Sequence, residues 1–185
     1  IFKKEDTNIL TYLTDDGLKI EPKHYVPIIP MLLVNGSVGI ATGFAINIPS
    51  YNPKYICKVL LKIMKDPSYI NHVKLVPWYK GFNGTIVPSE PANGTYISRG
   101  IYNIANRGVI RIDEIPIGIS ISNYKMHLER ILDEGKINDF VNRSTDREID
   151  FTINMNALKM KEIIEEGEGL YKFLGLESRI RRPNI

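Results

Sequence analysis

An α+β fold with a mainly antiparallel sheet is predicted for the later two thirds of this 185-residue chain. Three observations favour it. Short stretches rich in β-branched and aromatic residues are separated by turn-forming pairs that end in glycine. Several segments carry apolar residues at helical spacing, and one stretch near residue 150 alternates apolar and polar residues as a half-buried strand does. Residues 1–53 differ in composition, and we expect them to be the tail of another domain.

The segment from Pro22 to Pro53 is rich in proline and has closely spaced glycines around an apolar run. Proline disfavours both helix interiors and central strands. We therefore expect a buried, irregular segment that leads into an exposed loop. The longest apolar run, Val26 to Val34, is too short to cross a bilayer, so no membrane span is predicted.

The residues after Pro53 are predicted to form an amphipathic helix with a basic face. At 100° per residue, four lysines fall within roughly an 80° arc, and the apolar residues fall on the other side. The lysines are Lys54, Lys58, Lys62 and Lys65. Between Pro22 and Ser89 the only acidic residue is Asp66. A basic face without acidic neighbours favours a polyanion as partner, although a solvated surface is the alternative.

A meander of short strands is predicted from Pro77 onward, with turns at Asn83-Gly84, Asn93-Gly94 and Arg107-Gly108. A helix should follow, capped by Ser122 or Asn123 and ended by Gly135. Its apolar face consists of Tyr124, Leu128, Ile131 and Leu132.

Residues 149–155 alternate as a strand, with apolar side chains at every second position. Asn156 is predicted to cap a third helix that ends at Gly167.

Several kinds of chemistry are not predicted. A single cysteine, Cys57, excludes an internal disulfide and fits a reducing compartment, and the three histidines have no metal-ligand spacing with it. The stretch Gly118 to Ser122 lacks the last glycine of a nucleophile elbow. We therefore expect no catalytic residue and no metal site in this chain.

Ile40 is the most distinctive candidate for a binding role. It is a branched apolar residue within the glycine-rich stretch Asn35 to Gly43, where most neighbours are too small to bury it. An apolar side chain of this kind can act as a wedge that unstacks base pairs in bent DNA. The alternative is that Ile40 packs inside a glycine-rich core turn. The stretch lacks the Gly-Lys-Ser/Thr ending of a phosphate-binding loop.

Trp78-Tyr79, followed by Lys80, is a second candidate. Aromatic rings beside a basic residue can stack on bases, but aromatic residues before a strand also pack into cores. Both interpretations stay open.

These residues together resemble a known family. The run from Glu21 to Pro53 is similar to the winged-helix end of type IIA DNA topoisomerases, in the branch of eukaryotes and large DNA viruses. Pro77 to Ile86 resembles the opening of that family's tower domain, and Asp113 to Pro116 with Tyr124-Lys125 resembles a later tower signature. The resemblance implies the end of a winged-helix domain at 1–53 and an incomplete tower domain at 54–185.

The resemblance also implies a role in DNA. In this family the residue at the position of Ile40 intercalates into the gate DNA and helps to bend it. Further DNA contacts are expected at Asn35, Thr42, Lys54, Lys58, Lys62, Lys80 and Ser120. The family commonly has Gly and Trp where this chain has Ala41 and Phe44, so packing around the wedge is expected to differ.

The parent protein is expected to be an ATP-dependent, homodimeric enzyme that breaks both DNA strands transiently and passes a second duplex through. The catalytic tyrosine follows an arginine in this family, and no tyrosine of this chain does. We therefore place the catalytic tyrosine, the ATP site and the TOPRIM-bound Mg²⁺ outside the chain. The nucleus, or a viral replication site in host cytoplasm, is the expected location. The alternatives are a non-catalytic architectural module that bends DNA and a protein-interaction domain with an incidental lysine face.

Overall fold

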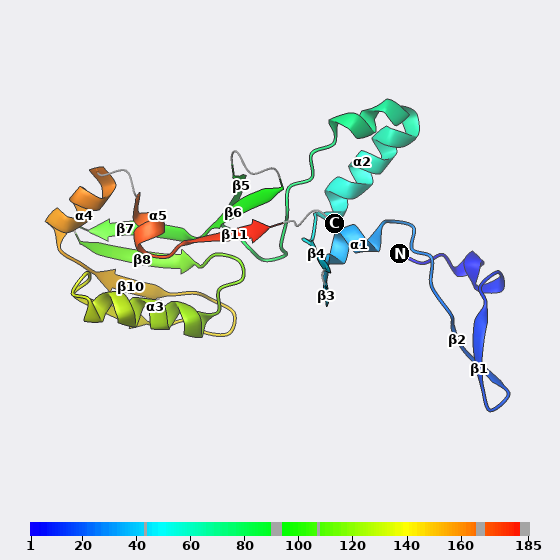
Figure 1. Cartoon of the computed structure of the whole chain (residues 1–185), viewed down its shortest axis with the longest axis horizontal. Helices are drawn as coiled ribbons and strands as arrows, with labels where there is room; N and C mark the ends of the chain where they lie inside the picture. Colours follow the sequence, from blue (N-terminus) through cyan, green and yellow to red (C-terminus); the bar gives the residue numbers. More distant parts are fainter. Residues whose placement is uncertain (43, 90–93, 107, 166–168, 182–185) are drawn as a thin grey trace. The chain divides into compact units, whose positions relative to one another are not determined.

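The computed structural model describes residues 1–42, 44–89, 94–106, 108–165 and 169–181. The chain divides into two compact units, Ile1–Leu75 and Val76–Ile185, shown in Figure 1. The predicted domain boundary lay after residue 53, whereas the helix that follows Pro53 belongs to the first compact unit. The assignment of the two parts to winged-helix and tower domains stays a prediction.

The first unit consists of two hairpins, a long helix and three short helical segments. Its elements are η1 (Lys4–Asn8), β1 (Tyr12–Asp15), β2 (Leu18–Pro22), α1 (Met31–Asn35), β3 (Ser37–Ala41), β4 (Phe44–Ile48), α2 (Pro53–Lys65) and η2 (Pro67–His72). Strands β1 and β2 form one antiparallel pair, and β3 and β4 form the other.

Residues 22–53 are more regular and more exposed than predicted. They form α1 and the β3–β4 hairpin, and the side chains of Tyr25, Val26 and Leu32 are 54%, 56% and 53% exposed. The prolines do not prevent this arrangement, because Pro30 precedes the first residue of α1, where a missing N–H breaks no helical hydrogen bond. A two-stranded hairpin also tolerates glycine and proline around it, because each strand has a single partner.

The predicted helix after residue 53 is confirmed as α2. The Asn52 side chain accepts hydrogen bonds from the two backbone N–H groups after Pro53, at 2.9 and 3.3 Å, and so caps the helix. Ile56 and Val59 are buried. Met64, expected on the buried side, is 80% exposed, so the apolar face is covered only along the earlier turns.

The second unit contains two antiparallel sheets and three helices, which confirms the predicted α+β class with antiparallel sheets. The elements are β5 (Thr85–Pro88), β6 (Thr95–Arg99), β7 (Ile101–Asn106), β8 (Val109–Glu114), α3 (Ile121–Asp133), β9 (Asp139–Asn142), β10 (Phe151–Asn154), α4 (Ala157–Glu165), α5 (Gly169–Phe173) and β11 (Glu177–Arg181). One sheet has the order β7-β8-β10-β9 and the other β11-β6-β5.

The predicted meander is wrong in one respect, because its strands belong to two sheets. Strand β5 pairs with β6, and β7 pairs with β8, but β6 and β7 lie in different sheets although only Gly100 separates them. The predicted turns at Asn93-Gly94 and Arg107-Gly108 fall within these two hairpins, and the first residue of each pair lies outside the described residues. Asn83-Gly84 precedes β5 and connects no pair of strands.

Helix α3 covers the core of the four-stranded sheet. It begins one residue after Ser120, whose hydroxyl accepts a hydrogen bond from the backbone N–H of Asn123 at 3.2 Å. The predicted cap at Ser122 or Asn123 was therefore wrong by two or three positions. The buried face of α3 consists of Tyr124, Leu128 and Ile131.

Strand β10 and helix α4 follow the prediction. Phe151 and Ile153 of β10 are fully buried. Asn156 precedes α4, and its side chain accepts the backbone N–H of Leu158 at 2.8 Å. The predicted end of this helix at Gly167 lies outside the described residues.

Gly100 is required where the chain passes from one sheet to the other. A Cβ at this position would collide with the carbonyl oxygen of Glu114 and lie 3.2 Å from Cδ2 of Leu176. We expect Gly100→Ala to lower the free energy of unfolding by about 1–3 kcal/mol, because the backbone must shift to admit the methyl group. Hydrogen exchange of the β8 amides measures the loss. Gly118→Ala is the control, since its φ of 86° is unfavourable but nothing lies within 4 Å of the added Cβ. An equal loss in both variants would contradict the steric argument.

The protonation of His127 makes the stability of the second unit depend on pH. Burial, together with the nearby Arg130 guanidinium, lowers the pKa of His127 below its ordinary value of 6.5. The unfolded chain therefore binds a proton at a higher pH than the folded chain, and the contribution to stability is complete above pH 6.5 and decreases as the pH falls below it. An NMR titration of the His127 ring should give a midpoint below 6.5. Arg130→Gln should move that midpoint upward, and a midpoint above 6.5 in the unchanged chain would contradict the prediction.

Candidate nucleic-acid interface

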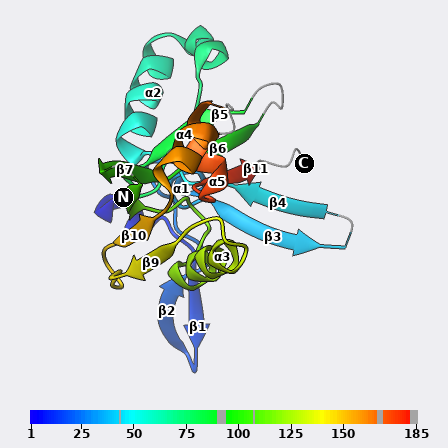
Figure 2. The same ribbon diagram turned by 90° about the vertical axis from the view of Figure 1, so that its left-hand side faces the viewer.

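The candidate wedge, Ile40, is the last but one residue of β3. Figure 2 shows the hairpin that β3 forms with β4. The side chain of Ile40 is 90% exposed. The alternative that Ile40 packs inside a glycine-rich core turn is therefore excluded for this chain. A large apolar side chain held this far from the core is available to contact a partner.

At two glycines of this hairpin region, other atoms lie so close to the glycine backbone that a Cβ would contact them. Gly36 has a φ of 71°, and a Cβ there would lie 2.5 Å from the carbonyl oxygen of Ile48. A Cβ at Gly39 would lie 3.0 Å from Cγ2 of Ile46, the residue opposite it on β4. Ile46 thus lies over Gly39 on one face of the hairpin. Because side chains alternate along a strand, Ile40 projects from the other face.

Hydrogen bonds tie the base of the hairpin to helix α1. The backbone N–H of Tyr51 donates to the carbonyl oxygen of Leu33 at 2.9 Å, and the Ser50 hydroxyl donates to that of Asn35 at 3.2 Å. Tyr51 is 2% exposed and anchors the segment between the hairpin and α2. The wedge is therefore carried by a hairpin with a fixed base.

Asn35 and Thr42, the predicted contacts on either side of Ile40, are both exposed. Asn35 ends α1, and Thr42 lies in the turn after β3. Gly43 and the side chains of Ala41 and Phe44 lie outside the described part of the chain. The prediction that packing around the wedge differs from the family pattern is therefore not tested.

The lysine face of α2 is present as predicted. Lys54, Lys58 and Lys62 are exposed. Within the described residues, none of them forms an ion pair with a carboxylate. Lys62 lies 4.8 Å from the centre of the Tyr69 ring and donates to the Tyr69 hydroxyl at 3.3 Å, which leaves its charge uncompensated.

The only acidic residue of this basic stretch is used for local structure. Asp66 accepts hydrogen bonds from the backbone N–H of Ser68 at 3.0 Å and from the Ser68 hydroxyl at 2.6 Å, and so caps η2. Among the residues that the structure describes, its carboxylate forms no ion pair with a lysine of α2.

Lys80 and Ser120 belong to the second unit, whereas Ile40 belongs to the first. Both residues are exposed. The Ser120 hydroxyl accepts the hydrogen bond from the backbone N–H of Asn123 that caps α3. Trp78 is 37% exposed, so neither stacking on bases nor core packing is excluded for its ring.

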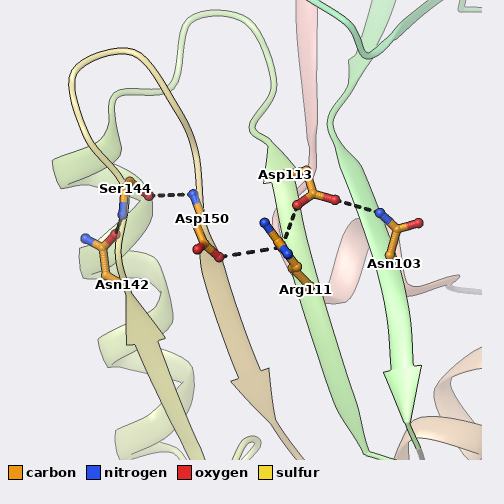
Figure 3. A network of polar contacts seen from close by, with 6 residues as sticks. All are labelled: Asn103, Arg111, Asp113, Asn142, Ser144 and Asp150. Atoms are coloured by element: carbon orange, nitrogen blue, oxygen red, sulfur yellow. Dashed lines mark hydrogen bonds and ion pairs between the residues drawn. The ribbon is translucent and has the colours of Figure 1, made fainter.

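A second group of charged residues, not singled out from the sequence, lies on the four-stranded sheet (Figure 3). Arg111 Nε is 2.8 Å from Oδ1 of Asp113 and 3.7 Å from Oδ1 of Asp150. Asn103 donates to the other oxygen of Asp113 at 2.6 Å. Because two carboxylates offset one guanidinium, this group does not form a phosphate-binding patch, and we assign it a structural role.

The described residues contain no group of three or more His, Cys, Asp and Glu side chains placed to hold a metal ion. Tyr124 is buried, its hydroxyl donates to the carbonyl oxygen of Leu174 at 2.8 Å, and burial raises its pKa. That hydroxyl supports the core and is not poised as a nucleophile. None of the described helices is long and apolar enough to span a bilayer.

The chain matches known proteins over its whole length. The family model for the A subunit of DNA gyrase/topoisomerase IV matches residues 1–185. The chain belongs to this family. The resemblance to type IIA DNA topoisomerases is thereby confirmed.

Relatives of this topoisomerase chain include the DNA topoisomerase 2 of Pisum sativum, 38% identical, and that of Plasmodium falciparum, 39% identical. Each match covers 100% of this chain and 13% of the relative. The chain thus spans about an eighth of the length of these relatives. They are eukaryotic, as the resemblance implied, and they give no support to a viral source.

A solved structure is similar as well. The crystal structure of the Plasmodium falciparum topoisomerase II DNA-binding, cleavage and re-ligation domain matches with a TM-score of 0.80 at 40% identity. The match covers 98% of this chain and 24% of that one.

Val38 was missed at the level of the sequence. It precedes Ile40 by two residues on β3 and is 77% exposed. The spacing of two would have indicated a shared face if a hairpin had been predicted there. Because a loop was expected there instead, the spacing of Val38 and Ile40 did not indicate that their side chains share a face.

Proposed function

We propose that this chain binds and bends the gate DNA of an ATP-dependent type II DNA topoisomerase. The observation that carries the proposal is the 90% exposure of Ile40 on a hairpin with a fixed base. Family membership and the relative's described role in DNA binding, cleavage and re-ligation support it.

In the proposed mechanism, Ile40 enters the base stack as an apolar wedge. Unstacking one base step costs about a few kcal/mol, which is offset when the bent duplex contacts more protein surface. The lysines of α2 provide part of that contact through backbone phosphates, and Lys80, Asn35, Thr42 and Ser120 are proposed to add to it. Such contacts position a duplex without reading its sequence.

The bond-breaking chemistry is proposed to reside elsewhere in the parent protein. The described residues offer no carboxylate cluster for Mg²⁺. We propose, as the family resemblance implies, that ATP and Mg²⁺ are bound elsewhere in the parent protein. When bound, the ion would stabilise charge on the phosphate under attack. We also propose that the parent is a homodimer that acts in a DNA-containing compartment, with the nucleus as the first expectation. Residues 1–53 are proposed to end a winged-helix domain and residues 54–185 to form most of a tower domain.

The test is a strand-passage assay with the complete protein. We expect relaxation of supercoiled DNA that requires both ATP and Mg²⁺, together with a bend seen by fluorescence transfer between the ends of a duplex. Bending without strand passage under any nucleotide condition would favour an architectural DNA-bending module. Absence of salt-dependent duplex binding would overturn both and favour a protein-interaction domain.

A further inference from the structure

The wedge face of the hairpin carries more than one exposed apolar side chain. Val38 and Ile40 are two residues apart on β3 and therefore project from the same face. Their side chains are 77% and 90% exposed. Opposite them on β4 lie Asn47 and Ala45, of which Ala45 is exposed and Asn47 half-buried. The exposed side chains that the two strands contribute to this face, Val38, Ile40 and Ala45, are therefore apolar.

The spacing of the two side chains matches the spacing of base pairs. Residues two apart on a strand are separated by about 6.6 Å. Successive base pairs rise by about 3.4 Å. When Ile40 enters a base step, a strand that follows the groove places Val38 over a base pair about two positions away.

Apolar wedges of this kind enter from the minor groove. There, A·T pairs present only acceptors, whereas G·C pairs add the N2 amino group of guanine as a donor. The methyl groups of valine accept no hydrogen bond, so covering that amino group would remove its water without replacing the bond. A·T pairs carry no such donor.

We infer that Val38 is a specificity-determining residue, which places the bend where the base pair about two positions from the wedge lacks a minor-groove amino group. This inference rests on the proposed wedge role of Ile40 and adds a sequence preference to it. Val38 acts by excluding guanine rather than by recognising a particular base.

The test compares duplexes that differ only in the minor groove, bound and bent by the complete protein. The base pair about two positions from the bend site is G·C, inosine·C, A·T or diaminopurine·T. Inosine removes the amino group from a G·C-like pair, and diaminopurine adds it to an A·T-like pair. We expect bending affinity about fivefold to tenfold higher for the two pairs without the amino group.

The Val38→Thr variant keeps the shape of the side chain and adds a hydroxyl that can accept from the amino group. It should reduce the discrimination to about twofold or less. The matched control is Val141→Thr, an exposed strand valine of the second unit, which should keep the discrimination of the unchanged protein. Differences in duplex stiffness would appear equally in all three proteins, so a Val38-dependent ratio identifies the contact.

Equal affinity for all four duplexes, or a preference for G·C set by the Asn47 amide, would overturn the inference. So would discrimination that persists in Val38→Thr. Bending that depends on Ile40 but not on the amino group would refute only the role of Val38 and leave the proposed function intact. Bending that does not depend on Ile40 refutes the proposed function itself.

Discussion

Replacing Ile40 by alanine in the complete protein is expected to lower the equilibrium constant for DNA bending by about thirtyfold. The substitution removes three carbon atoms from the proposed wedge, which corresponds to roughly 2 kcal/mol of lost apolar burial in the bent complex. DNA cleavage should decrease in parallel, because the bend places the phosphates for attack. Fluorescence transfer across a labelled duplex measures the bend angle and its population.

Folding should be almost unchanged in this variant, because a side chain that is 90% exposed contributes little to the core. A change within about 0.5 kcal/mol is expected for such a surface site. Ile9→Ala is a suitable control, since Ile9 is 80% exposed but does not belong to the hairpin. An unchanged bend in Ile40→Ala would remove the wedge from the mechanism.

Neutralising the lysine face of α2 is expected to have the second largest effect. In the triple variant Lys54→Gln, Lys58→Gln and Lys62→Gln, duplex affinity at low salt should fall at least about tenfold. The slope of log affinity against log salt should become shallower by about 0.9 for each phosphate that the protein no longer neutralises. The side-chain partner of Lys62 is the hydroxyl of Tyr69 rather than a carboxylate. Binding titrations at a series of salt concentrations measure both quantities.

A charge-matched control separates this effect from a general loss of positive charge. Lys125 and Lys136 form ion pairs with Glu129 and Glu134, and Lys159 donates to a backbone carbonyl oxygen. Their triple replacement by glutamine should leave the salt slope near that of the unchanged protein. If both triple variants show the same slope, the α2 lysines make no specific phosphate contacts.

Helix positions could be predicted from the sequence because their signals are local. The spacing of Tyr124, Leu128 and Ile131 identifies the buried face of α3, and the lysine stripe of α2 follows from the same period. The exact start of α3 was missed because Ser120 and Ser122 are both good caps. Which serine caps depends on where the preceding chain leaves the core.

Strand partners could not be predicted in the same way. Gly100 looks like a turn glycine, but it lies where the chain leaves one sheet for another, next to the backbone of Glu114. Glycines and prolines in residues 22–53 predicted an irregular segment, whereas they flank a hairpin and permit its close contacts. Local composition does not distinguish these cases, because pairing depends on residues far along the chain.

Motifs, composition and periodicity were enough to predict the family, the antiparallel α+β class, the basic face of α2 and Ile40 as the candidate wedge. The exposure of Ile40, the position of Val38 on the same face and the separation of β6 and β7 into different sheets became known from the three-dimensional fold. Composition and periodicity describe each segment separately. Exposure and strand pairing depend on the other segments that pack against it.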